Sequence, residues 1–299
     1  MKKGNLILMA AVLLYSCNSK QSSEEQAIQD SIDNVTVEAP AISEEVIADI
    51  VQQIPSPLEI SVLIKESGSD YDKAILNDDD NVSKYNSNYS RALNLGIYGT
   101  DLGYTNIYEQ NQDAVGYIGA VRDLADGLNI GQFFDFSTIR KLATNSSNLD
   151  SLLLITTRNF NKINAYLQDQ KRSDQSILLL TGGWIEALHV TCKVYEKNTS
   201  NKILREKIGE QKIILEQIQL LLSLFESDPN IKALGTDLKE LQTAFDKIEI
   251  INTYAESTFK EVDGVLVIED NSTSNVNITD ENVLEITRIT ESIRTKIIN

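Results

Sequence analysis

This chain of 299 residues has little of what most catalytic and metal-binding sites are built from. It contains one histidine, His189, and two cysteines, Cys17 and Cys192. Zinc sites and Ser-His-Asp triads depend on such side chains, usually several together. The sequence also has no Gly-x-Ser-x-Gly turn and no phosphate-binding Gly-x-x-x-x-Gly-Lys loop. We therefore predict no catalytic residue, no metal ligand and no cofactor.

Positive charge is scarce as well. The chain has 27 Lys and Arg against 44 Asp and Glu, which gives a formal net charge of −17. A chain this acidic is repelled by nucleic acid and by anionic lipid, so we predict no nucleic-acid partner. Hydrophobic residues make up 41% of the chain, which is enough for a packed core. The composition therefore predicts an acidic globular protein.

The apolar run near the N-terminus, residues 6–15, is too short to cross a membrane. A spanning helix needs roughly 20 apolar residues. Because Lys2 and Lys3 precede the run, it is typical of the hydrophobic region of a secretory signal peptide. We therefore predict a signal peptide over residues 1–16.

The four residues at the end of this run are Leu14-Tyr15-Ser16-Cys17. They resemble the lipobox of bacterial lipoproteins, and the resemblance implies cleavage before Cys17 and several acyl chains on its sulfur, a stable membrane anchor. Asn18 in place of Asp favours the outer membrane. We expect a lipid-anchored protein of the cell envelope, facing either the periplasm or the cell surface. The alternative is an ordinary secretory signal followed by a chance cysteine.

Residues 17–42 are rich in Ser, Gln, Glu and Asp and have no sustained apolar face. Such a composition predicts a disordered tether, here carrying the lipid, ahead of a single helical domain over residues 43–299. Within the tether, Asp30-Ser31-Ile32 resembles the short O-glycosylation sequon of Bacteroidota. Ser31 is therefore a candidate for O-glycosylation.

Long stretches after residue 89 have helical spacing of apolar residues. Steps of four and three residues recur in four seams. The seams run through Leu153, Thr156, Phe160, Ile163 and Leu167; Leu204, Ile208, Gln211, Leu215, Ile218, Leu222 and Phe225; Ile231, Leu234, Leu238, Leu241, Phe245 and Ile248; and Val283, Ile286, Thr290, Ile293 and Ile297. Asp228-Pro229-Asn230 is a short turn, so the helices beside it should pack antiparallel. We predict an all-α fold, a multi-helix bundle of about eight helices.

One segment breaks the helical pattern. Val262-Asp263-Gly264-Val265 is typical of a tight β-hairpin turn, and the residues around it have strand character. We predict a small β-hairpin or β-meander insert at about residues 253–278, before the C-terminal helix. The other irregular segment, Asn77–Asn81, contains three consecutive Asp but lacks the spacing of a calcium-binding loop. It predicts a solvated loop.

The segment 177–195 is apolar nearly all round, which is typical of a helix buried among others. It holds Trp184, Glu186 and His189. Glu186 and His189 lie three residues apart and share a face, so we expect them to hydrogen-bond each other in the core. A ligand-facing role for the three is the alternative, because burying ionisable groups without partners is costly. The Glu-x-x-His spacing resembles a di-iron motif, but that site needs a second copy.

The segment 95–110 combines three glycines with a polar stripe. Each glycine lowers helix propensity by about 1 kcal/mol relative to alanine, so close packing of a neighbouring helix should compensate. Asp101, Tyr104 and Tyr108 fall on one helix face. Tyrosine stripes suit sugar, peptide or aromatic ligands, and they equally suit the edge of a core. These three residues complete the set of candidate ligand-binding residues.

Four segments carry a wider resemblance. The leader, the tether, Ile54-Pro55-Ser56-Pro57 and the stretch 98–104 are similar to a group of uncharacterised Bacteroidota envelope lipoproteins. The resemblance implies an envelope location and one helical body, and it implies no activity. We therefore predict a binding or scaffolding module with an envelope protein or a small ligand as partner. The alternatives are an envelope hydrolase using acidic residues near His189, and a structural support of an outer-membrane complex.

Structure discriminates between these functions. A deep pocket lined by Asp101, Tyr104, Trp184 and His189 would favour a small ligand or catalysis. A solid core together with an exposed apolar patch of more than a few hundred Å² would favour a protein partner.

Overall fold

A computed structural model describes residues 44–54, 63–65, 67–143, 149–262, 265–269 and 271–299. All of them belong to one compact unit, Ile42–Asn299. The predicted signal peptide, the lipid-bearing Cys17, the tether and the candidate glycosylation site Ser31 lie outside the described residues and stay predictions.

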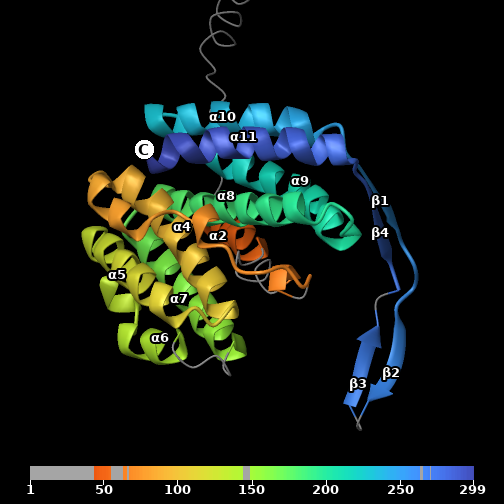
Figure 1. The fold of residues 1–299 in the computed structure, drawn as a ribbon, viewed down its shortest axis with the longest axis horizontal. Helices are drawn as coiled ribbons and strands as arrows, with labels where there is room; N and C mark the ends of the chain where they lie inside the picture. Colours follow the sequence, from red (N-terminus) through yellow and green to blue (C-terminus); the bar gives the residue numbers. More distant parts are fainter. Residues whose placement is uncertain (1–43, 55–62, 66, 144–148, 263–264, 270) are drawn as a thin grey trace, which may run out of the picture. The chain divides into compact units, whose positions relative to one another are not determined.

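The fold is mostly helical, with antiparallel strands near the C-terminus (Figure 1). The prediction of a helical fold with a small β insert is therefore confirmed. The α-helices are α2 (Glu44–Gln53), α4 (Asn88–Ile107), α5 (Asn111–Gly127), α6 (Phe136–Ala143), α7 (Leu149–Asp169), α8 (Ser173–Lys197), α9 (Lys202–Ser223), α10 (Pro229–Phe245) and α11 (Asp280–Ile298). Short 3-10 helices are η1 (Lys73–Ile75), η2 (Asp79–Lys84) and η3 (Gly131–Phe133).

Helix α8 is the central helix. It contacts α4, α7, α9 and α11, and α2 lies against it as well (Figure 1). Within the described residues, α8 is also long and apolar enough to cross a membrane, yet 89% of its apolar window is buried inside this chain. Such burial is typical of a core helix, because its apolar surface faces other helices. The Cys192 thiol on this helix is free and buried.

Helices α4 and α8 cross so closely that only glycine fits at the contact. A Cβ atom on Gly96 would lie 2.0 Å from the carbonyl oxygen of Leu179, and one on Gly182 would lie 2.0 Å from that of Leu93. Because glycine has no Cβ atom, the two backbones can touch at these positions. The prediction that close packing compensates for the glycines of segment 95–110 is confirmed for Gly96, whereas a Cβ atom on Gly99 would meet nothing within 4 Å.

Helices α9 and α10 form an antiparallel pair, as the turn between them predicts. Asp228 caps α10 by accepting hydrogen bonds from two backbone N–H groups, and Pro229 occupies the first turn. The Lys212 ammonium reaches the carbonyl oxygen of Ile248, and the Gln219 amide reaches that of Leu238. The predicted seam residues of both helices are buried apart from the half-buried Phe225.

The β insert is one long hairpin made of two nested ladders. Strand β1 (Glu249–Thr253) pairs antiparallel with β4 (Thr273–Asn277), and β2 (Thr258–Val262) pairs antiparallel with β3 (Val265–Glu269). We call residues 249–277 the β-arm. Its base packs on α9, where Val276 meets the bare backbone of Gly209. The β-arm begins four residues earlier than the predicted insert.

The prediction of a solvated loop at Asn77–Asn81 is only partly right: Asp78 and Asp80 are exposed, but most of the segment belongs to the short helix η2. Asp78 caps the helix η2 by accepting from the N–H of Asp80, and Asn77 is buried. The Tyr98 hydroxyl donates to the carbonyl oxygen of Asp78 over 2.8 Å. Asp side chains cap short helices as readily as they occupy loops, so the charge run alone did not distinguish the two.

Candidate functional site

Three ionisable side chains from three helices meet in the core. Arg294 on α11 donates two hydrogen bonds to Glu186 on α8, from Nε to Oε2 over 2.5 Å and from Nη2 to Oε1 over 2.7 Å. Asp101 on α4 lies beside them, and both carboxyl groups are fully buried. A bidentate guanidinium–carboxylate pair is a strong, directional interaction. Together with His189 these residues form the charge cluster.

Asp101 is the neutral member of the charge cluster. Burial, and next to it the negative charge of Glu186, raise the pKa of the Asp101 carboxyl well above its usual range. Its Oδ2 accepts a hydrogen bond from the N–H of Asn77 over 3.2 Å, while no donor in the described residues faces Oδ1. A protonated Asp101 leaves Glu186 as the carboxylate that pairs with Arg294.

His189 turns away from Glu186. Its Nε2 lies 3.0 Å from the carbonyl oxygen of Ile75, so Nε2 carries the proton. Burial lowers the pKa of His189, which keeps the ring neutral. The prediction that Glu186 and His189 hydrogen-bond each other is wrong, because Arg294 occupies both Glu186 oxygens. Arg294 also donates to the carbonyl oxygen of Ile75 over 3.3 Å.

Sequence reasoning missed Arg294. The residue follows Ile293 of the predicted C-terminal seam, and it lies four residues after Thr290 and eight after Ile286, on the same helix face. A buried glutamate needs a cation, so an arginine on the inner side of an amphipathic helix was the available signal. The burial of Glu186 would have pointed to it.

The tyrosines of α4 hold the preceding segment in place. The Tyr104 and Tyr108 rings lie 4.9 Å apart, and Tyr71 stacks on Tyr104 at 5.4 Å. The Tyr104 hydroxyl accepts from the N–H of Asp72 over 3.2 Å, and the Tyr108 hydroxyl donates to the carbonyl oxygen of Ser69 over 2.7 Å. These bonds tie Ser69–Asp72 to α4.

The six predicted residues therefore separate into three places. Asp101, Glu186 and His189 belong to the charge cluster. Tyr104 and Tyr108 pack with Tyr71. Trp184 faces the other way, where its Nε1 donates to Oε1 of Gln211 on α9 over 3.0 Å. The sequence placed all six on two helices, and the structure directs their side chains toward other parts of the core.

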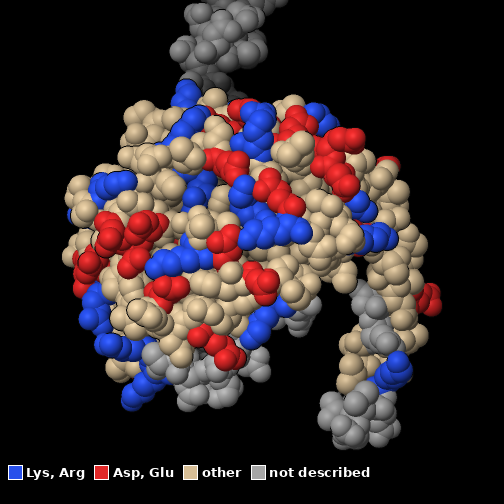
Figure 2. Space-filling model, in the orientation of Figure 1, with Lys and Arg blue, Asp and Glu red and all other residues tan. Residues whose placement is uncertain are grey.

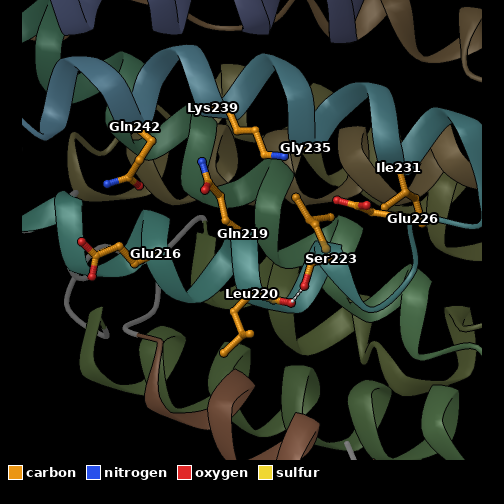
Figure 3. A pocket seen from close by; sticks show the side chains of 10 residues that line it. Glu216, Gln219, Leu220, Ser223, Glu226, Ile231, Gly235, Lys239 and Gln242 are labelled. Atoms are coloured by element: carbon orange, nitrogen blue, oxygen red, sulfur yellow. Dashed lines mark hydrogen bonds between the residues drawn. The ribbon is translucent and has the colours of Figure 1, made fainter. Parts of the chain in front are cut away.

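Two surface hollows lie elsewhere. A hollow of about 310 Å³ separates the facing sides of α9 and α10, with Gln219 rising from α9 toward α10 (Figure 3). A second of about 260 Å³ is lined by Tyr89 of α4, Leu234 of α10 and Ile293 of α11. None of the six predicted residues lines either hollow.

The described part of the chain holds no group of three or more His, Cys, Asp or Glu side chains placed to bind a metal ion. The charge cluster contains one bidentate ion pair, and both Arg294 and His189 contact the carbonyl oxygen of Ile75. No family model, curated protein or solved structure matches this chain. Its function is thus inferred from the geometry above.

Proposed function

We propose that this chain is a lipid-anchored envelope protein that acts as a binding or scaffolding module for another protein. One observation carries the proposal: exposed apolar side chains gather on the β-arm. Among the described residues, five of the eleven large apolar side chains that are exposed lie within its 29 residues. The five are Ile251, Tyr254, Phe259, Val267 and Ile268.

The β-arm lacks a covering layer. In the described structure, no other helix or strand makes substantial contact with β2 or β3. A two-stranded hairpin is only marginally stable in water by itself, and exposed apolar patches mark interaction sites. In the view of Figure 2 the β-arm shows few charged side chains. A partner surface would supply the missing packing.

The interior supports the same proposal. A small-ligand or hydrolase function at the charge cluster requires access to Glu186 and His189. Both are buried, Arg294 donates to both oxygens of Glu186, and Nε2 of His189 donates to the carbonyl oxygen of Ile75. We therefore favour a solid multi-helix bundle of about eight helices that carries the β-arm. If the partner is an outer-membrane protein, the chain would act as a structural support of an outer-membrane complex.

The lipid anchor and the tether would limit the distance between the β-arm and the membrane. A lipid on Cys17 and a disordered tether over residues 17–42 would leave 26 residues between the membrane and the helical body. An extended chain of that length spans at most roughly 90 Å. The β-arm could thus meet partners at or near the membrane that holds the lipid.

Photo-crosslinking in the native envelope tests the proposal. A benzophenone amino acid replaces Tyr254, whose side chain is 83% exposed, and in a matched control it replaces Leu284 on α11, which is 65% exposed. We expect a discrete protein adduct from position 254 and none from position 284. Adducts with lipid alone, or equal adducts from both positions, would contradict a protein-binding β-arm.

A further inference from the structure

Resting on the proposed function, we infer that the β-arm binds an extended, positively charged segment of another protein, which adds as a further strand to the edge of β2 or β3. The inference goes beyond protein binding in general, because it specifies the conformation and the charge of the partner segment.

The edges of the hairpin provide the backbone for such a strand. Each ladder of the β-arm has two strands, so in the described chain β2 and β3 each keep one side without a neighbouring strand. The unpaired N–H and C=O groups along such an edge form a template for an incoming strand. Strand addition would convert a marginal hairpin into a three-stranded sheet.

One face of the hairpin provides apolar contacts. Phe259 on β2 lies directly opposite Ile268 on β3, and the two side chains are 67% and 65% exposed. Side chains opposite each other on adjacent strands pack together, so an added strand would place every second residue beside this pair. The favoured partner segment therefore has an apolar residue at alternate positions.

The negative charge of the β-arm favours a positively charged segment over a second copy of the chain or anionic lipid at this strand edge. The β-arm contains six acidic residues and one lysine, Lys260, which gives a formal charge of −5. A second copy of the chain would bring another −5 to the contact, and anionic lipid would also be repelled. A segment that carries Lys or Arg as well as apolar residues complements this net negative charge.

Two synthetic peptides test the inference on the purified full chain. One alternates Lys and Val over about ten residues, and the other alternates Glu and Val over the same length, both with a fluorescent label. In fluorescence anisotropy at about 0.01 M salt, we expect the Lys-Val peptide to bind at least about tenfold more tightly. The difference should shrink at about 1 M salt, because the screening length falls from about 30 Å to about 3 Å.

Matched variants locate the site. Phe259→Thr keeps a strand-forming residue and removes the apolar ring, so binding of the Lys-Val peptide should weaken by at least about fivefold. Ile203→Thr removes an equally exposed apolar side chain from α9 and should leave binding unchanged. Circular dichroism would verify that both variants keep the fold.

Three results would overturn the inference: no binding of either peptide, equal binding of both, or an equal loss in Ile203→Thr and Phe259→Thr. The proposed function can fail separately. If position 254 crosslinks to another protein while neither peptide binds, protein binding by the β-arm stands and the basic added strand falls.

Discussion

Among single residues, Glu186 and Arg294 contribute most to the polar interior. Their side chains are 0% and 10% exposed, and they join α8 to α11. Moving such charges out of water costs several kcal/mol for each ion, which only good geometry and further hydrogen bonds offset. The bidentate contact and the Ile75 carbonyl supply both. The charge of Glu186, with its hydrogen bonds, outweighs burial and raises the pKa of Arg294.

Removing Arg294 should therefore destabilise the fold strongly. We expect Arg294→Met to lower the free energy of unfolding by about 3–5 kcal/mol, because Glu186 stays buried without its cation. Adding Glu186→Gln to Arg294→Met should recover part of the loss, since the amide is neutral. Urea denaturation measures all three proteins. A loss below about 1 kcal/mol in the single variant would contradict the pairing.

Asp101 should make stability fall as the pH rises. Its pKa is raised in the folded protein, so above the ordinary value of 3.8 the unfolded carboxyl ionises while the folded one keeps its proton. The folded state then loses stability, by up to about 1.4 kcal/mol per pH unit, until the pH reaches the folded pKa. Asp101→Asn copies the neutral acid and removes this dependence. Its stability relative to the natural chain should therefore increase between about pH 4 and pH 7.

Asp113 provides the matched control for this measurement. A hydrogen bond from Lys73 lowers the pKa of the Asp113 carboxyl. Its contribution to stability is fully present above the ordinary value of 3.8 and is lost only as the pH falls below it, so the stability of Asp113→Asn relative to the natural chain should stay constant between about pH 4 and pH 7. His189 titrates alike in all these proteins and cancels in the comparison. An Asp101→Asn difference that is independent of pH would contradict a protonated Asp101.

At the scale of elements, the crossing of α4 and α8 positions the charge cluster. Gly96 and Gly182 let the two backbones touch, and the Thr100 hydroxyl donates across the crossing to the carbonyl oxygen of Gly183 over 3.1 Å. Asp101 and Glu186 follow within a turn of this contact on their own helices. The closeness of the two carboxyl groups therefore depends on the glycines.

Substitutions at two glycines of α4 would measure the effects of packing and of helix propensity separately. Gly96→Ala would place a Cβ atom against backbone, so we expect it to lower the free energy of unfolding by about 1–3 kcal/mol. Gly99→Ala, one turn away, meets nothing within 4 Å and should stabilise the chain by up to about 1 kcal/mol. Thermal or urea unfolding of both variants measures these changes in stability. The same sign of change in both variants would argue against the close crossing.

For the molecule as a whole, the predicted anchor and the negative charge act together. The whole chain's net charge of −17 would be repelled by anionic lipid, so lipid on Cys17 would be the main link to the membrane. The tether and its candidate glycosylation site Ser31 would then separate the body from the bilayer. This arrangement leaves the β-arm open to a partner.

The anchor can be tested by removing the thiol. Cys17→Ser should abolish incorporation of labelled palmitate and shift the protein from the membrane fraction to the soluble fraction. The helical body does not depend on Cys17 in this prediction, so the far-ultraviolet circular dichroism should not change. Continued palmitate labelling of Cys17→Ser, or unlabelled Cys17 in the natural chain, would contradict the lipobox prediction.

Local patterns in the sequence determined much of the fold. The seam residues of α9, α10 and α11 could be predicted because helical periodicity repeats every few residues and needs no distant information. The glycines of α4 and α8 indicated a close crossing, and Val262–Val265 indicated the hairpin. Each of these signals lies within one element, where the sequence specifies the backbone directly.

Only the tertiary structure decided which polar groups meet. Glu186 and Arg294 are 108 residues apart in the chain, and the Ile75 carbonyl that both His189 and Arg294 contact lies more than a hundred residues before either. Such pairs depend on how whole helices cross, so no local spacing encodes them. The sequence alone therefore determined helices, turns and charge, whereas packing paired the predicted ligand residue Glu186 with Arg294 and left β2 and β3 without a covering layer.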